Sequence, residues 1–256
     1  MKKGILQDRV IFLTGGSVGI GWECAKAYAL EGAKVVLVAR GAEAVAKAAA
    51  ELGPEHLGLS CDVSMEADMA SAIGRTLERY CRLDAVHNNA GIATPSKPIH
   101  ETTDAEWDAL FNINLKSVLY TTRHAFEALK DSKGTILNTS SLVGVIGQEI
   151  HAAYTATKGG MNTLTKSMAL DYAKYGIRVN AVCPAGTWTP MLRKWCSEQP
   201  DPGSIERYLD EIHPIGYCPE GDAIADACVY LLSQKARFVT GHIMHVSGGA
   251  EIGYRR

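Results

Sequence analysis

Residues 9–21 of the chain read RVIFLTGGSVGIG. The run Arg9–Thr14 is short, apolar and rich in β-branched residues, as in a strand that is buried on both faces. Glycines at four of the next seven positions favour a tight turn, and a helical pattern follows from Gly21 to Glu31. In such a strand–turn–helix unit, the free N–H groups of the turn and of the helix N-terminus can bind a pyrophosphate. Residues 9–21 are therefore a predicted dinucleotide-binding loop.

The same alternation of short apolar runs with longer helical patterns continues along the chain. We expect strands at Arg9–Thr14, Lys34–Ala39, His56–Cys61, Asp84–His87, Gly134–Thr139, Ile177–Val182 and His242–Val246. We expect helices at Gly21–Glu31, Ala42–Leu52, Glu66–Tyr80, Ala105–Lys130, Ala153–Lys174 and Ala223–Leu232. The third helix has Ser64 as its expected N-cap. The repetition predicts an α/β fold, a single Rossmann-like doubly wound parallel sheet of about seven strands with helices on both faces. No linker divides residues 1–256, so we expect one dinucleotide-binding domain.

Composition and charge exclude several other classes of protein. The 256 residues are 46% hydrophobic and 21% charged with a formal net charge of −2, which disfavours a disordered chain and a nucleic-acid partner. No apolar run is long enough for a transmembrane helix, and the N-terminus lacks a signal-peptide pattern, so no membrane partner is expected. The seven cysteines form no C-x-x-C pair and no zinc-ligand spacing with the histidines. We therefore expect free thiols, no metal site and a cytoplasmic protein.

One segment, residues 186–217, departs from the alternation. It holds two tryptophans and four prolines, and it follows the sixth predicted strand. Ligands of open α/β sheets lie at the carboxyl ends of the strands. We therefore expect this segment to be a substrate-binding lid, with an ordinary surface loop as the alternative.

Tyr154 and Lys158 are four residues apart near the start of a predicted helix, so they share one face. A phenol with a pKa near 10 is a poor proton shuttle at neutral pH, but neighbouring positive charges lower that pKa because they favour the phenolate. A hydroxyl such as that of Ser141, which follows a strand, can donate a hydrogen bond to a substrate oxygen as it becomes negative. His151, three residues before Tyr154, is expected either to face the same cleft or only to be a polar residue near the helix start.

Together with the glycine loop, four further motifs resemble those of the short-chain dehydrogenase/reductase family, in order and over essentially the whole chain. They are Asn88-Asn89-Ala90-Gly91, Asn112-Ile-Asn114-Leu115, Ser140-Ser141 and Tyr154-Thr-Ala-Thr-Lys158. The resemblance implies an NAD(P)-dependent enzyme that transfers a hydride between a nicotinamide and a secondary alcohol, a ketone or a sugar hemiacetal. It also implies catalytic roles for Tyr154 as acid–base group, Ser141 as stabiliser of the substrate oxygen, Lys158 as ribose binder and depressor of the tyrosine pKa, and Asn114 as anchor of a relay water.

The resemblance also implies which residues bind the cofactor. They are Gly15, Ser17, Gly19, Ile20 and Gly21 in the loop, Asp62 and Val63 beside the adenine, Asn89, Ala90 and Gly91, then Tyr154 and Lys158, and finally Pro184, Thr187 and Thr189 around the carboxamide. An acidic residue at the end of the second strand would bind a ribose 2′-hydroxyl, but this chain has Ala39 there, followed by Arg40. Because a guanidinium suits a 2′-phosphate, NADP is expected, with NAD as the alternative.

The second half of the chain is more similar to a branch of the family that contains hydroxysteroid and sugar dehydrogenases. That resemblance implies a homotetramer and a small-molecule substrate, with a pocket lined by Ser141, Gln148, Tyr154, Trp188, Trp195 and Tyr254, the last from a neighbouring subunit. Two alternatives stay open. A 3-oxoacyl-[acyl-carrier-protein] reductase needs a basic surface for its acidic carrier, which the mixed charges of residues 186–217 do not favour. A non-catalytic dinucleotide sensor has no need for all four catalytic positions.

Overall fold

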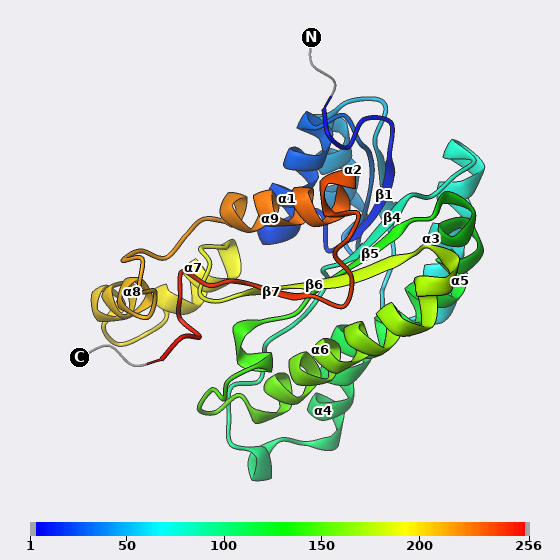
Figure 1. The fold of residues 1–256 in the computed structure, drawn as a ribbon. Helices are drawn as coiled ribbons and strands as arrows, with labels where there is room; N and C mark the ends of the chain where they lie inside the picture. The colour runs from blue at the N-terminus through cyan, green and yellow to red at the C-terminus, as the bar shows by residue number, and fades with distance from the viewer. Residues whose placement is uncertain (1–3, 254–256) are drawn as a thin grey trace.

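The computed structural model describes residues 4–253 and contains a parallel sheet of seven strands (Figure 1). The strands are β1 (Val10–Thr14), β2 (Lys34–Ala39), β3 (Leu57–Ser60), β4 (Ala85–Asn88), β5 (Thr135–Thr139), β6 (Arg178–Pro184) and β7 (Ile243–Val246). Their order across the sheet is β3-β2-β1-β4-β5-β6-β7, and all neighbouring pairs are parallel. The strand order reverses its direction between β1 and β4, so the predicted doubly wound sheet is confirmed.

Helices cover both faces of this sheet (Figure 1). One face carries α1 (Gly19–Leu30), α2 (Ala42–Leu52) and α9 (Gly221–Leu232), and the other carries α3 (Glu66–Tyr80), α4 (Asp104–Phe111), α5 (Ser117–Ser132) and α6 (Ala152–Tyr172). Two apolar cores result, one on each face of the sheet. Every residue of β1, β4 and β5 is buried, which explains why continuous apolar runs predict these strands better than alternation does.

The register of the central strands brings three chain segments to one edge of the sheet. Leu13 pairs with His87, and His87 pairs in turn with Leu137. The residues that follow β1, β4 and β5 therefore leave the sheet side by side at its carboxyl edge. This is where the glycine loop, the Asn89–Gly91 segment and Ser140-Ser141 meet.

Two details of the predicted helices are wrong. The predicted helix Ala105–Lys130 is interrupted, because a π-helical turn at Asn112–Lys116 separates α4 from α5. Ser64 is not the N-cap of α3, which begins at Glu66 after Met65 without a side-chain cap. Instead, the amide and hydroxyl of Ser64 both donate to Oδ1 of Asp62, an ionised acceptor that is stronger than a neutral one.

Residues 186–217 contain two helices that the sequence analysis does not predict, α7 (Pro190–Ser197) and α8 (Pro202–Glu211). Each starts with a proline behind a side-chain cap, Thr189 for α7 and Asp201 for α8, which is the favoured arrangement for a helix start. Both helices lie at the carboxyl end of the sheet, beside the C-terminal segment (Figure 1). Among residues 4–253, no helix is long and apolar enough to cross a membrane.

Candidate active site

The glycine loop has a conformation that larger residues would not allow. Gly15 and Gly19 both have positive φ angles, of 66° and 59°, and a Cβ added to Gly21 would lie 2.0 Å from the carbonyl oxygen of Gly15. Val18, the N-cap of α1, provides no side-chain hydrogen bond to the first helical amides. The loop thus presents backbone N–H groups and no side chain of its own at the helix start, a fit for a phosphate group.

The segment after β4 forms a wall of this loop. The amides of Asn89 and Ala90 both donate to Oγ1 of Thr14 at 3.0 Å. The Asn89 side chain also donates to the carbonyl oxygens of Thr14 and Gly15. A Cβ on Gly91 would lie 3.2 Å from Oδ1 of Asn114, so this backbone closely approaches the predicted catalytic groups. The predicted segment Asn89–Gly91 therefore adjoins both the loop and the catalytic cluster.

The segment that follows β6 reaches the other side of the loop. Pro184 ends the strand, Thr187 is buried and donates to the carbonyl oxygen of Ala185, and Thr189 caps α7 by accepting from the amide of Leu192. A Cβ on Gly19 would contact Thr189 at 3.4 Å. The predicted loop and carboxamide residues thus lie on adjoining segments.

Ser141, Tyr154 and Lys158 come together as predicted. Ser141 stands just after β5, and its Oγ accepts from the amide of Val143 in a short 3₁₀ turn. Tyr154 is half-buried, and its pKa is raised by burial and lowered in part by the neighbouring Ser141 side chain. The Nζ atom of Lys158 lies 5.7 Å from the centre of the Tyr154 ring. The same atom donates a 2.8 Å hydrogen bond to the carbonyl oxygen of Thr139, and Lys158 is 4% exposed. A phenol, a hydroxyl and an ammonium group therefore lie together at the carboxyl edge of the sheet.

The chain's own groups raise the pKa of Tyr154. Burial raises the pKa of this phenol, and the neighbouring Ser141 offsets only part of the increase. The lowering expected from neighbouring positive charges, Lys158 among them, stays a prediction. Burial also lowers the pKa of Lys158 to about 8, since an ammonium group is disfavoured in a poorly solvated site.

Asn114 is positioned by the π-helical turn. Its Oδ1 accepts from the amide of Ile92, and its Nδ2 donates to the carbonyl oxygen of the same residue, both at 2.8 Å. Nδ2 also lies 3.1 Å from Oγ1 of Thr157 on α6. The side chain of Asn114 therefore joins the segment after β4 to the helix that carries Tyr154 and Lys158.

The residues predicted to select the cofactor lie at the carboxyl ends of β2 and β3. Arg40 follows β2 and is exposed, and Ala39 pairs with Ser60 of β3. Hydrogen bonds from Ser64 lower the pKa of Asp62, and the positive charge of Arg40 lowers it further. Val63 beside it is buried. Arg40 therefore lies within electrostatic reach of Asp62, at the carboxyl ends of β2 and β3.

The predicted substrate residues are less closely associated. Gln148 is exposed in the turn before α6. Trp188 is half-buried, its amide bonds to the carbonyl oxygen of Pro219, and the guanidinium of Arg193 lies 4.9 Å from its ring centre. Trp195 on α7 is 39% exposed. No described contact joins these three side chains to Tyr154, and Tyr254 lies outside the described residues.

Two further residues approach the catalytic cluster. Ser96 Oγ lies 2.8 Å from Nε2 of His151, whose Nδ1 lies 2.9 Å from the carbonyl oxygen of Glu149. The carbonyl can only accept, so Nδ1 carries the proton and the hydroxyl of Ser96 donates to Nε2. The imidazole ring meets the ring of Tyr154 edge-on, with 6.4 Å between centroids. His151 was open in the sequence analysis, whereas Ser96 has no local pattern that identifies it.

Thr139 is a second residue that sequence reasoning missed, although it directly precedes Ser140-Ser141. Its carbonyl oxygen accepts from Lys158, and its hydroxyl lies 2.8 Å from Nε2 of His87. The end position of β5 could have identified it, because strand ends at this edge face the site.

The comparisons with known proteins cover nearly the whole chain. The family model described as enoyl-(acyl carrier protein) reductase matches residues 15–251. L-fucose dehydrogenase of Bos taurus is 38% identical over 248 residues, which are 97% of this chain and 91% of that protein. The solved structure of levodione reductase has a TM-score of 0.91 at 32% identity and covers 97% of this chain and 99% of its own. That of 3-ketoacyl-(acyl-carrier-protein) reductase from Brucella melitensis complexed with NADH has 0.89 at 30% identity, covering 96% and 99%.

Proposed function

This chain belongs to the short-chain dehydrogenase/reductase family and is an NAD(P)-dependent dehydrogenase or reductase of alcohols and ketones. On that basis we propose that Tyr154 is its acid–base group. We also propose that its substrate is a sugar hemiacetal or another small secondary alcohol. The observation that carries the assignment is the position of Tyr154, whose ring centre lies 5.7 Å from Nζ of the buried Lys158, beside Ser141 at the end of β5. The three groups lie where the chain leaves the carboxyl edge of the sheet, next to the glycine loop.

The residues present fit a nicotinamide dinucleotide. Gly15 and Gly19 have positive φ angles, and Gly21 has no space for a Cβ, so the loop before α1 keeps a backbone that suits a pyrophosphate at the helix N-terminus. Beside them we place Ser17, Ile20 and the segment Asn89–Gly91, with Asp62 and Val63 near the adenine and with Pro184, Thr187 and Thr189 near the carboxamide. When bound, the nicotinamide supplies or accepts the hydride.

The side chains of the cleft divide the remaining chemistry. Ser141 orients the substrate oxygen by a hydrogen bond that strengthens as the oxygen becomes negative. Tyr154 gives its proton to that oxygen during reduction, and its raised pKa keeps the phenol protonated at neutral pH. Oxidation requires the phenolate, which Lys158 favours as a nearby positive charge. Asn114 holds the segment after β4 against α6, which supports its expected role in a proton relay.

NADP is the proposed cofactor, and Arg40 is its proposed 2′-phosphate ligand. Ala39 leaves no carboxylate at the end of β2, and Arg40 is exposed beside it. The carboxylate of Asp62 is an argument against NADP, because its negative charge lies near Arg40 and would repel a 2′-phosphate. NAD is therefore the alternative, and the Brucella reductase structure was obtained with NADH.

A sugar is the first substrate class to test. His151 and Ser96 provide hydrogen-bonded polar groups beside Tyr154, and Trp188 and Trp195 provide aromatic faces that suit the C–H surface of a sugar ring. We propose that α7 and α8, within residues 186–217, form the lid over it. The charges of this segment do not favour an acidic acyl-carrier protein. Arg193 pairs with Glu220, Lys194 lies 3.8 Å from Glu198, and Arg207 shares α8 with three acidic residues.

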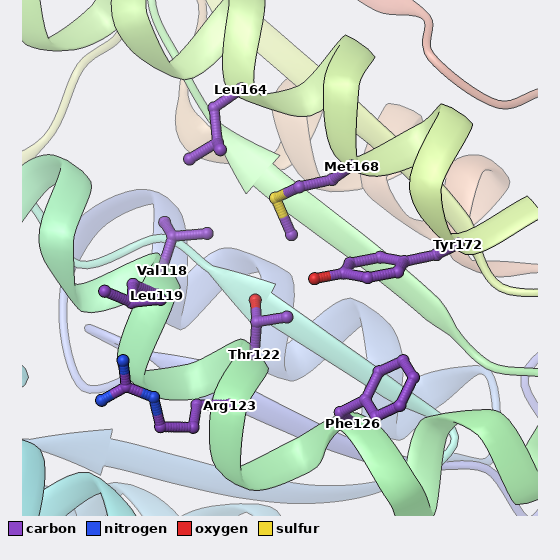
Figure 2. Close-up of a pocket in the computed structure, with 8 residues that line it drawn as sticks. All are labelled: Val118, Leu119, Thr122, Arg123, Phe126, Leu164, Met168 and Tyr172. Carbon is purple, nitrogen blue, oxygen red and sulfur yellow. The ribbon is translucent and has the colours of Figure 1, made fainter.

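Self-association is proposed at the outer face of α5 and α6. A groove of about 350 Å³ lies between them, and Figure 2 shows side chains of the two helices facing each other across it. The lining residues are Val118, Leu119, Thr122, Arg123, Phe126, Leu164, Met168 and Tyr172. Leu119 is 48% exposed, and a second copy of the chain that covers this face would bury it, as expected for a homotetramer.

The proposed compartment is the cytoplasm, which would keep the seven free thiols reduced.

A panel of aldoses, polyols, hydroxysteroids and 3-oxoacyl thioesters, followed by NAD(P)H absorbance, tests the substrate class. We expect turnover of at least one aldose or cyclic alcohol. Activity on thioesters alone contradicts the proposal in favour of a carrier-protein reductase, and dinucleotide binding without any turnover favours a sensor.

The molar mass of wild type and of Leu119→Glu, measured by light scattering, tests the tetramer. Leu30→Glu, at another exposed position, is the control.

A further inference from the structure

A cluster of sulfur, nitrogen and phenol groups lies in the core on the far side of β4 from α5. Cys24 and Tyr28 are one turn apart on α1, His87 is on β4, and Cys228 is on α9. All four side chains are fully buried. The Sγ atoms of Cys24 and Cys228 and a ring nitrogen of His87 all lie within 4.8 Å of one another. The proposed reaction uses none of these groups.

We propose that Cys24, His87 and Cys228 form a binding site for one thiolate-favouring metal ion of the zinc class, with the hydroxyl of Tyr28 at the fourth position. Two sulfurs and one imidazole are a ligand set that selects such an ion over magnesium or calcium. Around a tetrahedral zinc ion, ligand atoms lie about 3.5 Å apart. The cluster therefore needs only a small contraction.

The hydrogen bonds of His87 leave the lone pair of its Nδ1 atom for a metal ion. The hydroxyl of Thr139 donates to Oδ1 of Asn89, so it accepts the Nε2 proton of His87 at 2.8 Å. Nδ1 then carries a lone pair, and it points to the hydroxyl of Tyr28 at 2.9 Å. A ligating histidine whose other nitrogen donates to a fixed neighbour is the usual arrangement in metal sites.

The charges of the site also balance. Binding displaces the thiol protons of Cys24 and Cys228, and two thiolates with a divalent ion carry no net charge. A neutral cluster avoids the cost of an unpaired charge in the core.

The test uses the full chain purified from zinc-supplemented cells and, separately, refolded with Zn²⁺ or Co²⁺ after unfolding in chelator. Metal content per chain is measured together with the absorbance of the Co²⁺ form. We expect about one ion per chain, with a thiolate-to-cobalt band in the near ultraviolet and the visible bands of tetrahedral cobalt. Wild-type protein alone decides whether a site exists, so the result does not depend on the folding of a variant.

Variants assign the ligands. Cys24→Ser and Cys228→Ser are expected to lose the ion, while Cys61→Ser, an equally buried cysteine outside the cluster, keeps it. Thr139→Val is expected to weaken binding by about 10- to 100-fold because it frees the His87 ring. A metal-free wild type, retention by folded Cys24→Ser, or a mass 2 Da low (about two hydrogens) from a Cys24–Cys228 disulfide overturns the site. None of these outcomes depends on turnover.

Discussion

Lys158 donates a 2.8 Å hydrogen bond from Nζ to the carbonyl oxygen of Thr139, the last residue of β5. A main-chain acceptor at the strand end thus fixes the ammonium group of α6, and no substitution at position 139 removes that oxygen. The group lies 5.7 Å from the centre of the Tyr154 ring. The sheet edge therefore sets the distance between the lysine and the phenol.

Replacement of Tyr154 by phenylalanine is expected to lower kcat about 10²- to 10⁴-fold, because the proposed proton donor is lost. Dinucleotide binding should change little, since the glycine loop is intact. Steady-state rates and a fluorescence titration with NADPH measure the two quantities. Tyr80→Phe, which removes a hydroxyl bonded to the carbonyl oxygen of Glu55, is the control, and full turnover in Tyr154→Phe contradicts the assigned role.

The lowered pKa of Lys158 predicts a rise of stability with pH. The folded chain has its pKa at about 8, against an ordinary 10.5, so the unfolded chain binds more protons between these values and unfolding becomes less favourable as pH rises. From pH 7.5 to 9.0 the free energy of unfolding should gain about 1 kcal/mol relative to Lys158→Met. Denaturant titrations at both pH values measure it. The control Lys166→Met, at an exposed position, should show the same increase in the free energy of unfolding as wild type. If that free energy depends on pH equally in wild type and Lys158→Met, the lowered pKa of Lys158 is refuted.

Cofactor choice is expected to depend on Arg40. Arg40→Ala should lower the ratio of kcat/KM with NADP to that with NAD about 10- to 100-fold, the worth of a charge-assisted hydrogen bond. Ala39→Asp should lower it further, because the new carboxylate repels a 2′-phosphate. Arg75→Ala on α3 is the control for loss of a surface arginine. If the ratio is the same in wild type and Arg40→Ala, the arginine does not select the cofactor.

Two glycine-to-alanine substitutions should have different effects, a loss of dinucleotide affinity in Gly21→Ala and a gain of stability in Gly74→Ala. In Gly21→Ala the new Cβ meets the carbonyl oxygen of Gly15 at 2.0 Å, so the loop must move and dinucleotide affinity should fall at least about tenfold. In Gly74→Ala on α3 the Cβ has nothing within 4 Å, so the free energy of unfolding should rise by about 0.5–1 kcal/mol. Affinity and thermal unfolding are measured for both. Unchanged affinity in Gly21→Ala rejects the loop as the phosphate site.

Substitution of His151 is expected to affect substrate more than cofactor. His151→Ala removes the acceptor of Ser96 and the ring beside Tyr154, so KM for the substrate should rise about tenfold, the worth of one net hydrogen bond. KM for the dinucleotide should stay close to that of wild type. His100→Ala, at an exposed position, is the control. Equal changes in both KM values contradict a substrate-facing role.

The sequence predicts most of the fold because buried strands carry a local signal. Each of the seven expected strands exists, with bounds that differ by at most two residues, and β2, α2 and α3 have their predicted bounds. Helices α7 and α8 escape prediction because both are short and stand in a proline-rich segment. The π-helical turn escapes it as well, because nothing in Asn112–Lys116 marks the extra residue.

The site divides in the same way. Tyr154 and Lys158 are neighbours on one helix, and their proximity follows from spacing alone. The link between His151 and Ser96, and the cluster of Cys24, His87 and Cys228, join segments that are distant in sequence. No spacing rule reaches such groups. The upward shift of the pKa of Tyr154 follows from burial, which is a property of the folded chain that spacing does not give.

The π-helical turn between α4 and α5 also limits how the length of this chain can vary. Such a turn contains one residue more than an α-helical turn, so it offsets everything after it by about 100° around the helix axis. Deletion of a single residue from Asn112–Lys116 would leave a continuous helix but rotate the buried stripe of Val118, Thr121 and Ala125 toward water. It would also carry Asn114 away from Ile92. The length of these five residues thus sets the rotation of α5 relative to α4. In natural relatives of different length, we expect insertions and deletions to lie outside this turn.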